Sequence, residues 1–149
     1  MISRSIIKLK LLESIQEQLD VLSNQIRELT LDAQNDAKSS AGDKHETALS
    51  MMHLEQEKLN VKFAQLLDTK QKVLTLPTEK MIYKVVEGSL VITKNVILYV
   101  SVAWPAIKYE HKSILCLSKD APLMQVLQNQ TVGSKVLFNS NTFEIIDIL

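Results

Sequence analysis

The feature that most constrains the fold is a long segment without glycine or proline that runs from Ser3 to about Lys38. Its apolar residues recur at alternating spacings of three and four, at Leu12, Ile15, Leu19, Leu22, Ile26, Leu29 and Ala33. This heptad pattern is typical of a helix that packs along its length against another helix. Gln, Glu, Asp, Asn and Lys fill the other faces, so we expect one buried stripe on a solvated helix.

A second helix is predicted from about His45 to Leu74, where glycine and proline are again absent. Its apolar positions are less regular and comprise Ala48, Met52, Leu59, Phe63, Leu66 and Val73. Glu55 and Lys62 stand where a strict seam would hold apolar groups. The small residues between the two segments, 39–43, predict a loop. A short connection favours antiparallel neighbours, so residues 1–76 are predicted to form a helical hairpin with arms on the order of 50 Å long.

The composition changes after Pro77, where β-branched and aromatic residues gather in short runs. The strand-like runs are Met81–Val86, Leu90–Thr93, Val96–Val102, Ser113–Leu117, Lys135–Phe138 and Thr142–Ile148. Gly88-Ser89 and Lys94-Asn95 indicate turns or bulges between the first runs, and Pro122–Gln128 indicates one short helix that opens on a proline. Residues 77–149 are therefore predicted to form a small antiparallel β domain with one covering helix, which makes the chain an α+β protein.

Seventeen basic and seventeen acidic residues cancel. Because the chain lacks the basic excess that steers proteins onto nucleic acid, we expect no direct binding to duplex DNA. The longest apolar stretch, Asn95–Ile107, is too short to span a bilayer, and lysines interrupt the N-terminus before a signal-peptide core forms. The single cysteine, Cys116, fits a reducing compartment. We expect a soluble, monomeric, cytoplasmic protein with no membrane partner.

The candidate site is the predicted loop, where Gly42-Asp43-Lys44-His45-Glu46 places two carboxylates three residues apart at a helix start. Asp-x-x-Glu at this position is a capping box, in which Asp43 accepts from the amide of Glu46 and Glu46 reaches back. The helix dipole favours this interpretation. Alternatively, the two carboxylates share a divalent cation, because Mg²⁺ sites commonly use one or two carboxylates and leave the other positions to water and phosphate.

Gly42-Asp43-x-x-Glu46, followed by Ala48, resembles the Gly-Asp-Leu-Lys-Glu-Asn-Ala tip of the GreA/GreB family of bacterial transcript cleavage factors. Further motifs follow in the order of that family's C-terminal domain, namely Gly88-Ser-Leu-Val91, Ala121-Pro122-Leu123, Val132-Gly133 and Phe143–Ile148. The resemblance therefore spans most of the chain. The sequence departs from the family at Thr47, Leu49 and Ser50, where the family commonly has Asn and then an acidic-aromatic pair.

The resemblance implies a fold and a mechanism. The C-terminal domain is expected to be FKBP-like without the isomerase role and to dock at the rim of the secondary channel of RNA polymerase, while the hairpin enters the channel. Asp43 and Glu46 would then help to hold a second Mg²⁺ in the polymerase active site, where the polymerase cleaves its own backtracked RNA. The isolated chain is expected to bind no cofactor and to be inert, so it is not an enzyme by itself.

Other functions remain open. The same scaffold occurs in relatives that occupy the channel and inhibit, and a coiled-coil interaction module would use Asp43 and Glu46 only as caps. A small cysteine enzyme would pair Cys116 with His111, although the apolar residues around Cys116 favour a packing cysteine. Asp32 and Asp36, one helical turn apart near the loop, are typical of a solvated helix face.

Overall fold

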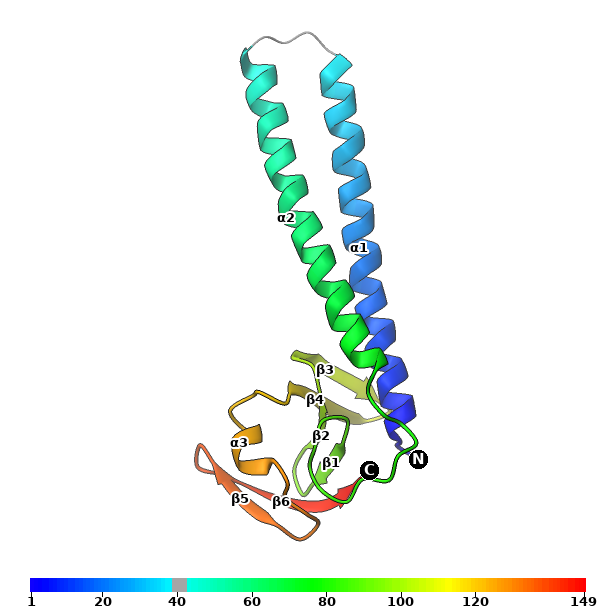
Figure 1. The fold of residues 1–149 in the computed structure, drawn as a ribbon, viewed down its shortest axis with the longest axis vertical. Coiled ribbons are helices and arrows are strands. Elements are labelled where there is room, and N and C mark those ends of the chain that lie inside the picture. The colour runs from blue at the N-terminus through cyan, green and yellow to red at the C-terminus, as the bar shows by residue number, and fades with distance from the viewer. Residues whose placement is uncertain (39–42) are drawn as a thin grey trace. The chain divides into compact units, whose positions relative to one another are not determined.

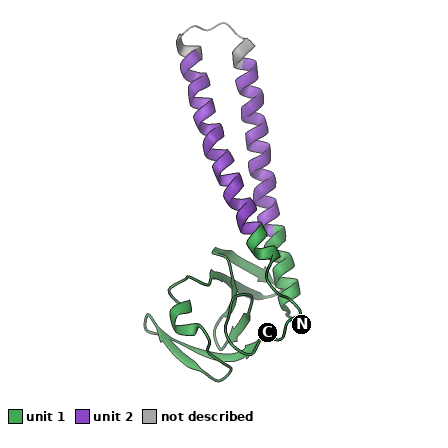
Figure 2. Ribbon diagram, viewed as in Figure 1, with its two compact units in different colours: residues 1–13, 71–149 green, residues 14–70 purple. Residues whose placement is uncertain are grey.

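The computed structural model describes the backbone of residues 1–38 and 43–149, and the side chains of residues 1–35 and 46–149. Two long helices, α1 (Arg4–Lys38) and α2 (Asp43–Leu74), precede six strands and a short helix (Figure 1). Both long helices and the α+β class are therefore confirmed. The chain divides into two compact units, residues 14–70 and residues 1–13 with 71–149 (Figure 2). No helix of the described residues combines the length and the apolar character needed to cross a membrane.

In the unit of residues 14–70, α1 and α2 run antiparallel and side by side (Figure 2). The predicted α1 seam is confirmed, because each of its positions in this unit is buried or half-buried: Ile15, Leu19, Leu22, Ile26, Leu29 and Ala33. On α2 the buried or half-buried apolar positions are Ala48, Leu49, Met52, Leu59, Phe63 and Leu66. Glu55 and Lys62 are exposed, while Gln56 is half-buried, so a polar residue interrupts the α2 stripe.

Two polar contacts join the arms of this hairpin. The side-chain amide of Gln56 donates to Oγ1 of Thr30 at 3.0 Å, and the ammonium group of Lys70 donates to Oε1 of Gln16 at 2.9 Å. The Gln56 contact is partly buried. If one helix slipped past the other, Gln56 would face an apolar side chain and lose its partner, at a cost in free energy. A polar pair in an apolar seam thus fixes the register of the two arms.

The second half of the chain forms a six-stranded sheet in the order β3-β4-β2-β1-β6-β5. Its strands are β1 (Leu90–Thr93), β2 (Ile97–Ser101), β3 (Trp104–Tyr109), β4 (Lys112–Ser118), β5 (Lys135–Phe138) and β6 (Asn141–Ile148). Most neighbouring strands are antiparallel, as predicted. However, β2 and β4 are parallel, with Ile97 opposite Ile114 and Tyr99 opposite Cys116. The prediction of a wholly antiparallel sheet is wrong at this pair, because β4 inserts between β2 and the edge strand β3.

Strand β3 was not predicted, because it contains Pro105, which cannot donate a backbone hydrogen bond to a neighbouring strand. The strand lies at the edge of the sheet, and its pairing with β4 shifts register between Trp104 and Ile107. An edge position and a bulge are the places where a sheet accepts proline. The predicted helix at Pro122–Gln128 is confirmed in shorter form as α3 (Met124–Leu127).

The run Met81–Val86 was expected to form a strand but contributes only an isolated bridge, between Lys84 and Thr131. Val85 donates its N–H to the carbonyl of Gln130 at 2.9 Å and accepts from the N–H of Asn129 at 2.8 Å. Backbone pairing therefore ends after a single residue. The rest of this β-prone run follows the linker that leaves α2.

Strand β2 is buried on both faces of the sheet. One face contributes to the core cluster of Val85, Val91, Leu98, Val100, Met124, Leu127, Ile145 and Ile148. On the other face Tyr99 is fully buried. Burial is the main cause that raises the pKa of Tyr99 to about 12, and the neighbouring Cys116 raises it further. The Arg4 guanidinium lowers this pKa in part. The Tyr109 hydroxyl also donates to the carbonyl of Met1 at 3.4 Å. The first turn of α1 thus covers the face opposite α3.

Two cations one turn apart on α1, Arg4 and Lys8, bind the chain where α2 ends, and we call them the cationic clasp. They donate to four backbone carbonyl groups, those of Leu74, Leu76, Pro77 and Lys80. The two bonds from Lys8 measure 2.8 and 2.7 Å. The carbonyls at a helix end lack partners within the helix and carry partial negative charge, so cationic donors stabilise them.

Replacing Lys8 by Met keeps the aliphatic stem but removes both hydrogen bonds. The free energy of unfolding should fall by about 1–2 kcal/mol, measured by urea denaturation. Lys58→Met, at an exposed position of α2, is the matched control and should change the free energy by less than about 0.5 kcal/mol. Equal losses in the two variants would contradict a stabilising clasp.

Gly88 and Gly133 form a second matched pair, because both have positive φ, +92° and +90°. A β-carbon at Gly88 would lie 2.8 Å from Cδ of Pro77, whereas one at Gly133 would meet no heavy atom of the described residues within 4 Å. Gly133→Ala should therefore cost about 1 kcal/mol of stability from backbone strain alone. Gly88→Ala should cost about 1–3 kcal/mol more, because the proline ring must also move. Urea denaturation compares the two, and equal losses would show that the contact with Pro77 is unimportant.

Candidate functional site

The predicted site lies at the start of α2. Helix α1 ends at Lys38 and α2 begins at Asp43, so Asp43 opens the helix and Glu46 lies in its first turn. Glu46 is exposed. Gly42 and the side chains of Asp43 and His45 lie outside the described residues. A helix therefore starts at the two acids, and capping and cation sharing both stay predictions, because each depends on the side chain of Asp43.

A shallow cleft of about 300 Å³ lies between the arms in the unit of residues 14–70. It is lined by Gln25, Glu28, Leu29, Asp32, Glu55 and Leu59. Three of these side chains are carboxylates and none is basic, so the cleft has a negative potential. Asp32 is exposed, as expected for a solvated helix face, and the side chain of Asp36 lies outside the described residues. Sequence analysis missed Glu28 and Glu55 because they come from different arms, which only the hairpin brings together.

This acidic cleft is not a formed metal site. Within the described part of the chain, no three His, Cys, Asp or Glu side chains are grouped so that they could hold a metal ion. That search does not include the side chain of Asp43. A Mg²⁺ ion that takes one or two protein carboxylates fills its remaining positions with water and phosphate. A cation at Asp43 and Glu46 would therefore take its other ligands from a partner or from solvent.

The alternative pair, Cys116 and His111, is not brought together. His111 lies in the turn before β4 and Cys116 lies well inside that strand, roughly 15 Å away at the rise of an extended chain. Burial raises the pKa of the Cys116 thiol from 9.0 to about 11, although hydrogen bonds to the Ser101 side chain and the Ile107 backbone lower it in part. The thiol is protonated at neutral pH, so the nucleophilic thiolate is scarce. This geometry opposes a Cys–His active site.

No protein-family model matches this sequence, and no curated protein matches it with significant similarity. Function is therefore inferred from the residues themselves: the acidic start of α2, the hairpin that carries it, and the motifs of the C-terminal half.

The raised pKa of Cys116 predicts a slow reaction with iodoacetamide. At pH 8 the native thiol should react about a hundredfold more slowly than the urea-unfolded chain, because its pKa lies about two units higher. The Cys116 thiol binds its proton more tightly in the native state than in the unfolded chain. Its contribution to the free energy of unfolding is therefore complete below pH 9 and declines as the pH rises through about 11. Cys116 is the single cysteine, so the label reports on it alone. Equal rates in native and unfolded protein would mean that the thiol is not buried.

Proposed function

We propose that the chain is a Gre-like factor that binds RNA polymerase, inserts its helical hairpin into the secondary channel and stimulates Mg²⁺-dependent cleavage of backtracked RNA. One observation carries the proposal: Asp43 and Glu46 lie in the first turn of α2, directly after the connection between two long antiparallel helices. At this place the sequence resembles the acidic tip of the Gre factors, whose hairpin enters the polymerase.

The surface of the hairpin supports the same proposal. Its arms, residues 14–38 and 43–70, are each about 40 Å long. The seam takes up the apolar stripe of each arm, and the remaining faces are largely polar or charged. A rod with this surface can enter a narrow aqueous channel without exposing its packing stripe. The contacts Gln56–Thr30 and Lys70–Gln16 keep its two arms in register.

In this proposal Asp43 and Glu46 act inside the partner. Two carboxylates one helical turn apart can bind the same cation, and Mg²⁺ keeps several waters when it binds few protein ligands. The cation would generate the attacking nucleophile from a bound water and stabilise the negative charge that develops on the phosphate. The carboxylates Glu28, Asp32 and Glu55 would add to the field that attracts the cation. Such a factor works in the cytoplasm, where bacterial polymerase is found, and is inert without it.

A second candidate is a protein that occupies the channel and inhibits. The departures from the Gre tip at Thr47, Leu49 and Ser50 favour it, because they remove the Asn and the acidic-aromatic pair that follow the two acids in the family. In that case Asp43 and Glu46 serve only to cap α2.

The test uses purified bacterial RNA polymerase halted in a backtracked complex with labelled RNA and Mg²⁺. Adding the chain should speed shortening of the RNA, and Asp43→Asn and Glu46→Gln should each reduce that stimulation by at least about a hundredfold, because metal catalysis loses a ligand charge. Asn caps a helix about as well as Asp, so Asp43→Asn separates metal binding from capping. Glu57→Gln, an exposed acid further along α2, is the control and should retain full stimulation.

Each other outcome rejects part of the proposal. Full activity of Asp43→Asn would show that this carboxylate does not bind the metal. Slower transcription without cleavage would select the inhibitor. A chain that does not bind polymerase at all would leave only the interaction module.

A further inference from the structure

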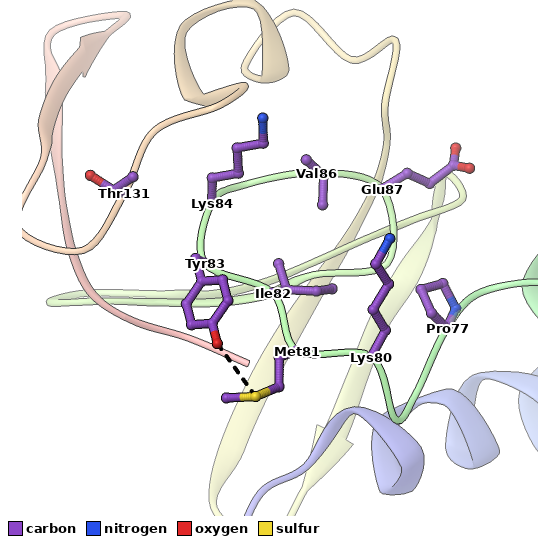
Figure 3. Close-up of a pocket in the computed structure, with 9 residues that line it drawn as sticks. All are labelled: Pro77, Lys80, Met81, Ile82, Tyr83, Lys84, Val86, Glu87 and Thr131. Atoms are coloured by element: carbon purple, nitrogen blue, oxygen red, sulfur yellow. Dashed lines mark hydrogen bonds between the residues drawn. The ribbon is translucent and has the colours of Figure 1, made fainter.

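A pocket of about 390 Å³ lies in the linker that follows α2, and we call it the linker pocket (Figure 3). It is lined by Pro77, Lys80, Met81, Ile82, Tyr83, Lys84, Val86, Glu87 and Thr131. Its walls are mainly apolar, and its volume falls near the lower end of the range of about 300–1,000 Å³ that is usual for ligand sites. It therefore suits a small apolar group rather than a helix or a long segment.

The shape of the linker limits how a ligand enters. Figure 3 shows the chain from Pro77 to Glu87 curving around the pocket, with the side chains of Lys80, Ile82 and Val86 turned into the space that it encloses. Arg4 of the clasp holds the carbonyls of Pro77 and Lys80, so this wall is fixed before any ligand arrives. A pocket of this volume accommodates the last residue of a guest chain.

The polar groups of the pocket favour a carboxylate. The charged residues of the lining are two lysines and one acid, Lys80, Lys84 and Glu87, and Lys80 forms no ion pair with another described residue. The N–H groups of Ile82 and Lys84 also make no hydrogen bond to any described residue. Val85 pairs with Asn129 and Gln130, and neighbouring residues of an extended chain direct their N–H groups to the opposite edge. N–H groups without a partner and a lysine that line the same pocket are donors that can bind a carboxylate.

The apolar surface continues outside the pocket. Met81 and Tyr83 are 72% and 71% exposed, and the Tyr83 hydroxyl donates to Sδ of Met81 at 3.4 Å, as the dashed line in Figure 3 shows. Methionine and tyrosine are enriched at protein interfaces. A small molecule that filled the pocket would leave this pair uncovered, whereas a peptide whose last residue occupied the pocket would lie across it.

We propose that the linker pocket binds the C-terminus of a partner protein, with an apolar last side chain against Ile82 and Val86 and its carboxylate at Lys80. The preceding residues of the peptide pack on Met81 and Tyr83. The proposal does not depend on the polymerase function, because none of these residues belongs to the acidic start of α2, and the assay below contains no polymerase.

The probes are short fluorescein-labelled peptides that end in Leu, Val or Phe, each made with a free C-terminal carboxylate and as the C-terminal amide. Fluorescence anisotropy with the full chain should show that at least one free acid binds about tenfold more tightly than its amide, because a charge-assisted hydrogen bond is lost in the amide. Lys80→Met should remove this difference. Lys119→Met, at an exposed lysine outside the pocket, should preserve it.

Decanoate, a small apolar carboxylate, distinguishes a site for a peptide C-terminus from a site for a small molecule. Tyr83→Ala should weaken the best peptide at least about threefold and leave competition by decanoate unchanged, because only the peptide reaches beyond the pocket. Peptides that do not bind, amides that bind as well as acids, or equal effects of Lys80→Met and Lys119→Met would each overturn the proposal. Decanoate that binds more tightly than every peptide would also overturn it and would assign the pocket to a small molecule.

Discussion

The compact unit of residues 1–13 and 71–149 depends on the hydrogen bonds from Arg4 and Lys8 to the chain that leaves α2. The end of a helix leaves carbonyl groups without partners, and here the chain continues as a linker with almost no regular pairing of its own. Because α1 runs antiparallel to α2, its first turns lie beside that exit and supply the missing donors. Arg4 also fixes one wall of the linker pocket and acts electrostatically on the buried Tyr99 of the sheet. The two cations thus connect the end of α2, the linker that follows it and the sheet.

A second constraint is the register of α1 against α2 in the hairpin. A heptad seam of Leu, Ile and Ala gives affinity between helices but tolerates sliding, since many apolar positions are interchangeable. The pair Gln56–Thr30 limits that freedom, because a partly buried amide that slides away from its partner loses a hydrogen bond. A fixed register matters most where α1 ends and α2 begins, since it determines which residues close the hairpin. The polar interruption that makes the α2 pattern irregular in sequence therefore has a structural role.

Sequence predicted the parts of the fold that depend on local periodicity. The ends of β1 and β5 agree with the predicted runs, and α1 and its seam follow the heptad spacing, because each of these signals is contained in neighbouring residues. Contacts between distant residues were not predictable in this way. Only the tertiary fold brings together the residues that form the parallel pairing of β2 with β4, the edge strand around Pro105 and the clasp. Of the candidate site, the helix start at Asp43 and the burial around Cys116 were predicted, whereas the grouping of Glu28, Asp32 and Glu55 was not.

The zero net charge conceals an uneven distribution along the chain. Residues 28–55, which include the end of α1 and the start of α2, contain six acidic and two basic side chains, a net charge of −4, so the remainder carries +4. A segment with this charge is repelled by the phosphates of RNA unless a cation lies between them. In the proposed function this repulsion is useful, because the hairpin can then approach a phosphodiester only through Mg²⁺. The charge that opposes direct binding to nucleic acid is thus the same charge that would recruit the catalytic metal.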